Sequence, residues 1–151
     1  MRVERSYFRR NVAVNSLPPG AQASTYLTQG GAIAANMFMD ATVPYDIIDC
    51  TFVENQGGQG GALYVDTGHL QVLNCVFLRN GDHSECSLGG AMTSRARTVI
   101  DNCTFVDNKA QDQGGALHFL PYDTLNVSRS RFQGNSVLKQ NGGAIHVLGV
   151  S

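Results

Sequence analysis

Two histidines occupy equivalent places in the sequence, where a pair of imidazoles could bind a transition metal. His118 and His146 each follow the apolar residue of a Gly-Gly-Ala motif, and imidazole nitrogen is a good ligand for such ions. No third ligand accompanies the pair, so the simpler interpretation is an outward column of exposed side chains. His69 and His83 have the surroundings of loop residues. We therefore expect neither a metal site nor a cofactor.

Three cysteines recur at one position of a repeated pattern. Cys50, Cys75 and Cys103 each lie two residues before a phenylalanine. Packed free thiols, a disulfide between two of the three, and a metal site are all compatible with this spacing. Free thiols are favoured, because stacked strands would point the side chains side by side and no C-x-x-C spacing occurs. Cys86 belongs to a separate segment and could be free or bridged to another chain.

Acidic residues offer two further candidate sites. Asp49 and Asp101 lie near predicted turns but at different positions of the repeat, which gives no support for a calcium cluster. Glu54 and Asp107 occupy equivalent positions, with Arg79 at that position in the repeat between them. Such alternation of sign in one column is typical of a solvent-exposed charge ladder. We predict no catalytic residue among these groups.

The glycine-rich stretch FVENQGGQGGAL, residues 52–63, has the composition of a phosphate-binding loop. A P-loop requires a lysine and a hydroxyl residue after its last glycine, and neither is present there. No helix is predicted to follow, so no helix N-terminus would face an anion. The recurrence of the stretch explains it better.

Two motifs alternate along the chain, five times each. Gly-Gly-Ala plus an apolar residue occupies 30–33, 60–63, 89–92, 114–117 and 142–145, so successive copies are 30, 29, 25 and 28 residues apart. A Phe-x-x-Asn motif precedes every copy, which predicts one repeat domain over residues 1–151. Its phenylalanines are Phe8, Phe52, Phe77, Phe105 and Phe132, and its asparagines are Asn11, Asn55, Asn80, Asn108 and Asn135.

Alignment on the phenylalanine reveals the pattern of short strands. A β-branched residue lies five positions before it, a cysteine or serine two positions before it, and a variable residue directly before it. This alternation, without any helical period, predicts strands whose Cys and Phe side chains share one face. One repeat cannot bury its own apolar face, so we expect the repeats to stack as a parallel β-solenoid of about five coils.

The asparagine and glycine columns have physical roles in such a solenoid. A side-chain amide both donates and accepts, so the five asparagines are predicted to form an internal hydrogen-bonded turn ladder. Asparagine also tolerates the left-handed backbone of a sharp corner. The paired glycines permit positive φ and close approach between turns. The phenylalanines are predicted to form the core together with Cys50, Cys75 and Cys103.

These motifs resemble the polymorphic outer membrane protein repeats of chlamydiae, which are defined by GGA[ILV] and FxxN. The chain carries five of each, with Met92 the one departure. The resemblance implies an all-β fold, a right-handed single-stranded parallel β-helix that is a segment of a longer solenoid. In the chlamydial proteins it implies an adhesive surface domain. Polygalacturonases share the right-handed β-helix, but their N-T-D, D-D and G-H-G motifs are missing here, so we expect no enzyme.

Composition narrows the range of partners. The net charge is -1 and charged residues make up 15% of the chain, so no nucleic-acid-binding surface is predicted. No apolar run approaches the length of a membrane span. The N-terminal segment lacks the continuous apolar stretch of a signal peptide. Two N-x-[ST] sequons make Asn102 and Asn126 candidate glycosylation sites.

The sequence thus predicts a non-catalytic structural or adhesive module, extracellular or at a cell surface. A host or surface ligand would meet its outer columns or the insertions at residues 17–28 and 82–87. Exposed strand edges at the solenoid ends predict contact with further coils or with other protein chains. Two alternatives remain: a subunit of an extracellular filament or surface assembly, and a polysaccharide-binding or polysaccharide-degrading β-helix.

Overall fold

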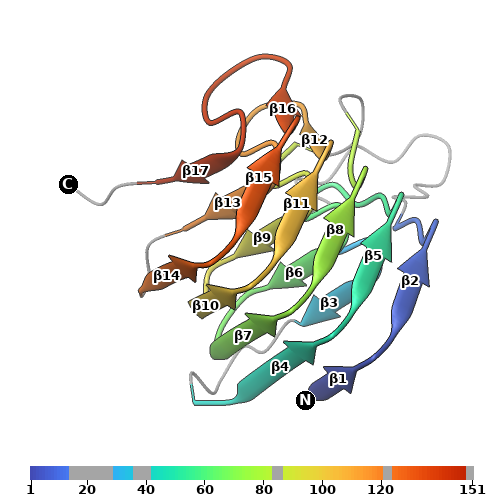
Figure 1. Cartoon of the computed structure of the whole chain (residues 1–151). Coiled ribbons are helices and arrows are strands. Elements are labelled where there is room, and N and C mark those ends of the chain that lie inside the picture. The colour runs from blue at the N-terminus through green and yellow to red at the C-terminus, as the bar shows by residue number, and fades with distance from the viewer. Residues whose placement is uncertain (14–28, 36–41, 83–86, 121–123, 149–151) are drawn as a thin grey trace, which may run out of the picture.

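The computed structural model is a parallel β-solenoid, and it describes residues 1–13, 29–35, 42–82, 87–120 and 124–148. Each repeat contributes one strand to each of three five-stranded sheets (Figure 1). No helix occurs within these ranges, and every strand pair is parallel. Five strands in a sheet are separated by four steps, so the chain makes about four turns between its first and last rungs. The predicted all-β stacked fold is confirmed.

The strands are short and follow one another from sheet to sheet in a fixed order. The first sheet contains β1 (Arg2–Glu4), β4 (Pro44–Ile48), β7 (His69–Leu73), β10 (Arg97–Asp101) and β14 (Leu125–Ser128). The second contains β2 (Tyr7–Arg9), β5 (Thr51–Val53), β8 (Val76–Leu78), β11 (Thr104–Val106) and β15 (Arg131–Gln133). The third contains β3 (Ile33–Ala35), β6 (Leu63–Val65), β9 (Met92–Ser94), β13 (Leu117–Phe119) and β17 (Ile145–Val147). A two-stranded ladder pairs β12 (Lys109–Ala110) with β16 (Ser136–Val137).

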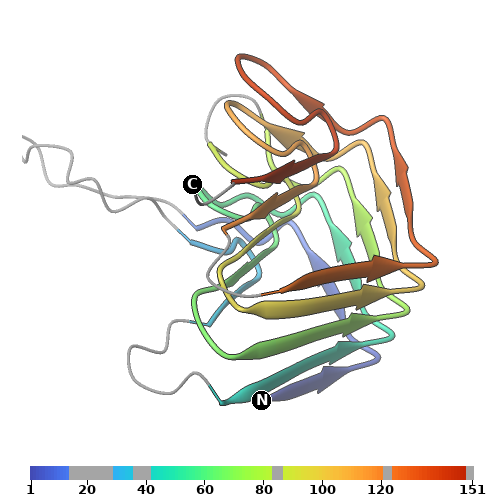
Figure 2. The same cartoon turned by 90° about the vertical axis from the view of Figure 1, so that its left-hand side faces the viewer.

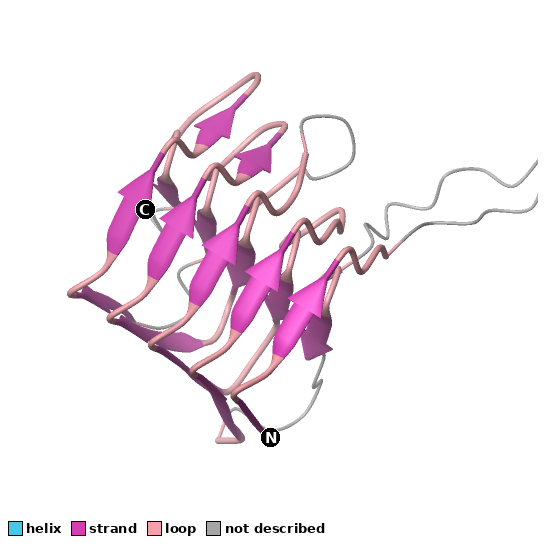
Figure 3. Cartoon of the chain, turned by 45° about the vertical axis from the view of Figure 1, so that its right-hand side comes forward, coloured by secondary structure: helices cyan, strands magenta, loops and turns pink. Residues whose placement is uncertain are grey.

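The register of the sheets places equivalent residues of the repeats side by side. Phe52 pairs with Phe77, and the residue after each Gly-Gly-Ala pairs likewise, as Leu63 does with Met92. Figure 2 shows the strands of each sheet lying one above another, and Figure 3 shows the three sheets as separate faces joined by loops. Columns of the repeat alignment are therefore rows of neighbours in space.

The core is a continuous stack of the phenylalanine column and the apolar columns beside it. The rings of Phe52 and Phe77 have centroids 4.7 Å apart and planes 4° apart, and both side chains are fully buried. The spacing equals the distance between strands of a sheet, so the stacked rings follow from the backbone register. Aliphatic residues such as Ile47 and Leu63 fill the space around the stack.

Two corners of each coil have left-handed backbone, and all of the residues that adopt it there except Gly134 are residues other than glycine. We expected the ladder asparagines to take this conformation, but the residue before each one takes it instead. The left-handed residue changes the side on which the next side chain projects. Its own side chain therefore points out of the turn, and the asparagine after it points into the turn. The first corner uses Arg5, Asp49, Asn74, Asn102 and Arg129, and the second uses Arg10, Glu54, Arg79, Asp107 and Gly134.

The third corner depends on the paired glycines. Gly60 has a φ of 65°, a conformation that side chains rarely adopt. A Cβ on Gly61 would collide with the carbonyl oxygen of Gly90 on the next coil and with the backbone of Gly81. The motif therefore combines a positive φ with close approach of successive turns.

Candidate functional site

The asparagine column is a hydrogen-bonded ladder inside the turn. The backbone N–H and the Nδ2 of Asn80 both donate to Asn108 Oδ1, at 2.9 and 3.0 Å. The same Nδ2 donates to the carbonyl of Phe52 on the other side, at 3.0 Å. Asn55 and Asn108 make the equivalent bonds and are fully buried. Each interior asparagine therefore connects three successive coils.

The asparagines at the two ends of this ladder leave different hydrogen-bonding groups without a partner in the described chain. Asn11, on the first rung, donates to Asn55 Oδ1, but no described group donates to Asn11 Oδ1. Asn135, on the last rung, accepts through Oδ1 and donates to the Phe105 carbonyl. No described group accepts its backbone N–H. One end of the solenoid thus offers an acceptor, and the other offers donors.

The core is open at both ends. Phe8 and Phe132 are only partly buried, whereas the three phenylalanines between them are fully covered. Val147 on the last rung and Leu148 after it expose 51% and 43% of their surface. Each end face therefore presents apolar side chains together with unpaired strand edges.

The cysteine column is a second internal ladder. The structure has Cys50, Cys75 and Cys103 as free, buried thiols. Cys75 Sγ donates to the carbonyl of Leu73 at 3.2 Å and accepts from the backbone N–H of Cys50 at 3.4 Å. The hydroxyl of Ser130 accepts from the Cys103 N–H in the same way. The Cys103 thiol and burial raise the pKa of the Cys75 thiol well above its usual range, so Cys75 stays protonated and unreactive.

Charged side chains gather on the outer side of the second corner. Glu54 accepts from Arg10 at 2.8 Å and from Arg79 at 3.0 Å, and Arg9 lies 3.4 Å away. The hydrogen bonds from Arg10 and Arg79 lower the pKa of Glu54 to about 2. Arg79 pairs with Glu54 and makes no bond to Asp107, so the predicted charge ladder is interrupted at that step.

The left-handed residues of the first corner form an outward column that includes two asparagines, Asn74 and Asn102. Asn74 donates to Asp49 Oδ1 at 2.9 Å, and Asn102 donates to Asn74 Oδ1 at 2.9 Å. The carboxylate of Asp101 lies beside this column and binds Arg129, whose hydrogen bonds lower the Asp101 pKa to about 2. Asp49 and Asp101 do not converge on one position. Asn102 is exposed in this column, and the other sequon residue, Asn126, is exposed on β14.

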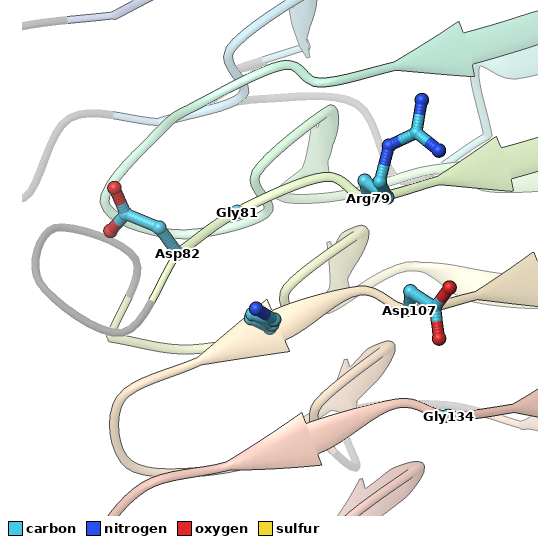
Figure 4. A pocket seen from close by; sticks show the side chains of 6 residues that line it. Arg79, Gly81, Asp82, Asp107 and Gly134 are labelled. Atoms are coloured by element: carbon cyan, nitrogen blue, oxygen red, sulfur yellow. The ribbon is translucent and has the colours of Figure 1, made fainter.

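A shallow hollow of about 380 Å³ lies beside the second corner (Figure 4). The side chains of Arg79 and Asp107 project from successive coils, and Asp82 lies further along the turn. Lys109 also lines the hollow, and Gly134 leaves its column without a side chain. Within the described chain, neither Asp107 nor Lys109 forms an ion pair. The hollow is therefore lined by side chains of both charges.

The histidine column differs from its prediction. His118 and His146 are neighbours, with ring centroids 5.2 Å apart and planes 26° apart. His118 was expected to be exposed but retains only 2% of its surface, and Thr93 beside it is also buried. The cause is the segment before each Gly-Gly-Ala, which folds back over the third sheet, as the 3.0 Å bond from Thr93 Oγ1 to the Leu88 carbonyl indicates. Burial, and secondarily His146, lowers the pKa of His118 to about 4.

The sequence reasoning missed one buried polar pair. Ser94 and Thr98 hydroxyls lie 2.7 Å apart inside the core. Their columns hold Val65 and Leu70 in the preceding repeat, so polar residues in otherwise apolar columns were the available signal. Cys86, His83 and the insertion 17–28 lie outside the described residues.

Comparison with known proteins gives one similarity. The family described as right handed beta helix region matches residues 29–151. No curated protein and no solved structure matches the chain. Among the described residues, no helix is long and apolar enough to cross a membrane. The matched residues contain all five Gly-Gly-Ala corners.

Proposed function

The chain belongs to the right-handed β-helix family, and from this premise we propose that it is a non-catalytic structural and adhesive module that extends by stacking at its ends. The family includes both pectate-lyase-like enzymes and proteins without catalysis, so membership leaves the activity open. The choice between them rests on which groups of the chain lack partners. The unpaired groups of the asparagine ladder lie at the two end faces.

The observation that carries the proposal is the mismatch between the ends of the asparagine ladder. Asn135 has an unused backbone N–H, and Asn11 has an unused Oδ1. In the interior, the same two groups bond to each other between successive coils. A rung placed in register beyond Asn135 would therefore repeat the interior contact. Stacking would bury both groups, and each would then need the other as its hydrogen-bond partner.

The apolar columns support the same arrangement. Phe132 would stack on a phenylalanine equivalent to Phe8, and Val127 would meet a residue equivalent to Val3. The stacking would cover Phe8 and Phe132, which are only partly buried now. The partner rung has the same repeat pattern, and it comes either from a second copy or from further coils.

The adhesive part of the proposal rests on the motifs. Five GGA and five FxxN copies resemble the chlamydial surface repeats, which supports a location outside the cell or on its surface. A rigid solenoid leaves its outer columns free to vary, so they can recognise a host or surface ligand. A binding assay of the labelled chain on immobilised matrix proteins and glycans would test this part. A β-solenoid of unrelated sequence serves as the control.

Sedimentation velocity over a range of protein concentrations tests the stacking. We expect concentration-dependent growth into elongated particles. Phe132→Lys places a charge on the end core and should leave single chains. Arg131→Lys changes the exposed neighbour in the same strand and should assemble like the wild type.

Two outcomes separate the possible partners of the end faces. Assembly of the wild type that Phe132→Lys abolishes would favour the filament or surface-assembly subunit. A wild type that stays single at all concentrations would restrict the partner to further coils of a longer solenoid. Assembly unchanged by Phe132→Lys would contradict end stacking.

A polysaccharide-related function is the second candidate, favoured by the hollow beside Arg79. Lys109 and Asp107 lack ion-pair partners within the described chain and line this hollow, so acidic or neutral sugar chains could meet them there. A Lys109→Ala variant should then lose binding on a glycan array, with Lys139→Ala as a surface control. Absence of glycan binding and of lyase activity on acidic polysaccharides would remove this candidate.

A further inference from the structure

The histidine pair on the third sheet contains buried nitrogen atoms without hydrogen-bond partners. Both ring nitrogens of His118 and the Nδ1 of His146 are inaccessible to solvent and unpaired. Buried polar groups are nearly always satisfied, and an exception calls for a missing water or ion. The three unpaired nitrogen atoms belong to two residues that are neighbours on the third sheet, so they lie at one site.

We propose that His118 and His146 bind one divalent transition-metal ion of the Zn²⁺, Cu²⁺ or Ni²⁺ class. The two residues are direct neighbours in the parallel pair of β13 and β17, and their rings lie 5.2 Å apart. The rings are stacked with their planes 26° apart, so both side chains must rotate to turn one in-plane nitrogen lone pair each toward a shared ion. Imidazole is a preferred ligand for these metals and must be neutral to bind them.

The described surroundings of the pair offer no hydrogen-bond partner to its buried nitrogen atoms. Thr93, on the opposite side of His118, donates its hydroxyl to the Leu88 carbonyl. The unused nitrogen atoms of the two rings have no competing protein group among the described residues.

Access to the pair is from the last rung. His146 is half-buried, and Val147 and Leu148 after it are exposed. An ion would therefore approach from the end of the solenoid and reach the buried nitrogen atoms when the rings rotate. No group of three or more His, Cys, Asp or Glu side chains that could hold a metal ion occurs among the described residues. The ion would therefore keep water in its other positions, as in open metal sites.

Calorimetric titration of the tag-free chain with Zn²⁺ tests the site. We expect one Zn²⁺ per chain, and at least tenfold weaker binding in His146→Gln, which removes a ligand from a half-buried terminal position. His118→Gln should have the same effect. His69→Gln changes an exposed histidine on another sheet and should leave the titration unchanged. Zn²⁺ should also raise the melting temperature of the wild type but not of His146→Gln.

Cu²⁺ gives a second, independent readout. Electron paramagnetic resonance of the Cu²⁺-loaded wild type should report two coordinating imidazole nitrogens, and that of His146→Gln should report one or none. Zn²⁺ binding that is equal in wild type and His146→Gln would overturn the proposal. A wild type that binds no Zn²⁺ at all would overturn it as well.

Discussion

The amide of Asn80 bonds to Asn108 Oδ1 at 3.0 Å while it also bonds to the carbonyl of Phe52 on the opposite side. A single side chain thus connects the coil before it to the coil after it. The bonds lie in a fully buried position, where no water can replace them. The asparagine is therefore the polar counterpart of the phenylalanine stack.

Replacing Asn80 with leucine should destabilise the protein by about 3 kcal/mol, because it leaves several buried groups without partners. These are the Asn55 N–H and amide and the Phe52 carbonyl. Urea unfolding followed by circular dichroism measures the change. Asn11→Leu, at the exposed end of the ladder, should cost much less. A loss below about 1 kcal/mol for Asn80→Leu would contradict the internal ladder.

Gly61→Ala should fail to fold or lose more than about 2 kcal/mol, because the new methyl group overlaps the backbone of the next coil. Gly143 occupies the same motif position on the last rung, and a Cβ there meets only the Asn135 carbonyl, at 3.6 Å. Gly143→Ala is therefore the matched control and should be tolerated. Soluble yield and thermal unfolding of both variants provide the comparison. Equal behaviour of the two would show that coil spacing is not the constraint.

Cys75→Ser should be tolerated with a loss of about 1 kcal/mol or less, whereas Cys75→Val should cost more. A hydroxyl can accept from the Cys50 N–H and donate to the Leu73 carbonyl, as Ser130 does on its own rung. Valine fills the space but leaves the Cys50 N–H unpaired. Chemical denaturation ranks the two variants. Valine performing as well as serine would mean that packing alone determines this column.

Stability should fall by about 2 kcal/mol between pH 7 and pH 5 because of His118. Its pKa is about 4 in the folded protein and near 6.5 when unfolded. The unfolded chain therefore takes up a proton over this range and the folded chain does not, which favours unfolding as the pH falls. The pKa values of Glu54 and Asp101 are lowered to about 2. Their ion pairs therefore remain intact at pH 5 and are lost only at lower pH, when the two carboxylates become protonated.

Urea midpoints at the two pH values measure this effect, with metal-free buffer throughout. His118→Gln should remove most of the dependence, and His69→Gln should retain it. A flat profile in the wild type would mean that His118 is accessible to solvent in the folded protein.

The repeat columns made most of the fold predictable, because the strands pair in register and residues at equivalent positions of the repeat therefore become neighbours in space. Phe52, Asn55 and Leu63 recur with the same companions, so their neighbours could be read from the alignment. The left-handed residues could not, since side chains as different as those of Arg10, Glu54 and Gly134 occupy this one position of the repeat. Only their place directly before the asparagine marks them.

The candidate site was less predictable than the fold. Alternation within a strand suggested that His118 faces solvent, but it carries no information about a loop packed over the outer face. Thr93 in the same column is likewise buried by that segment. The end faces depend on which donors and acceptors remain unused. That property emerges only when every bond of the ladder is assigned to its two atoms.

The direction of the asparagine ladder restricts the symmetry of any assembly of these solenoids. A twofold axis at one end would set acceptor against acceptor, as with two copies of Asn11, and at the other end donor against donor. Only a translation along the axis, with or without rotation, brings Asn135 to Asn11. Such a contact is heterologous and does not close on itself. Assemblies built in this way would have two unlike tips and no inherent length, so a separate capping partner would have to set their size.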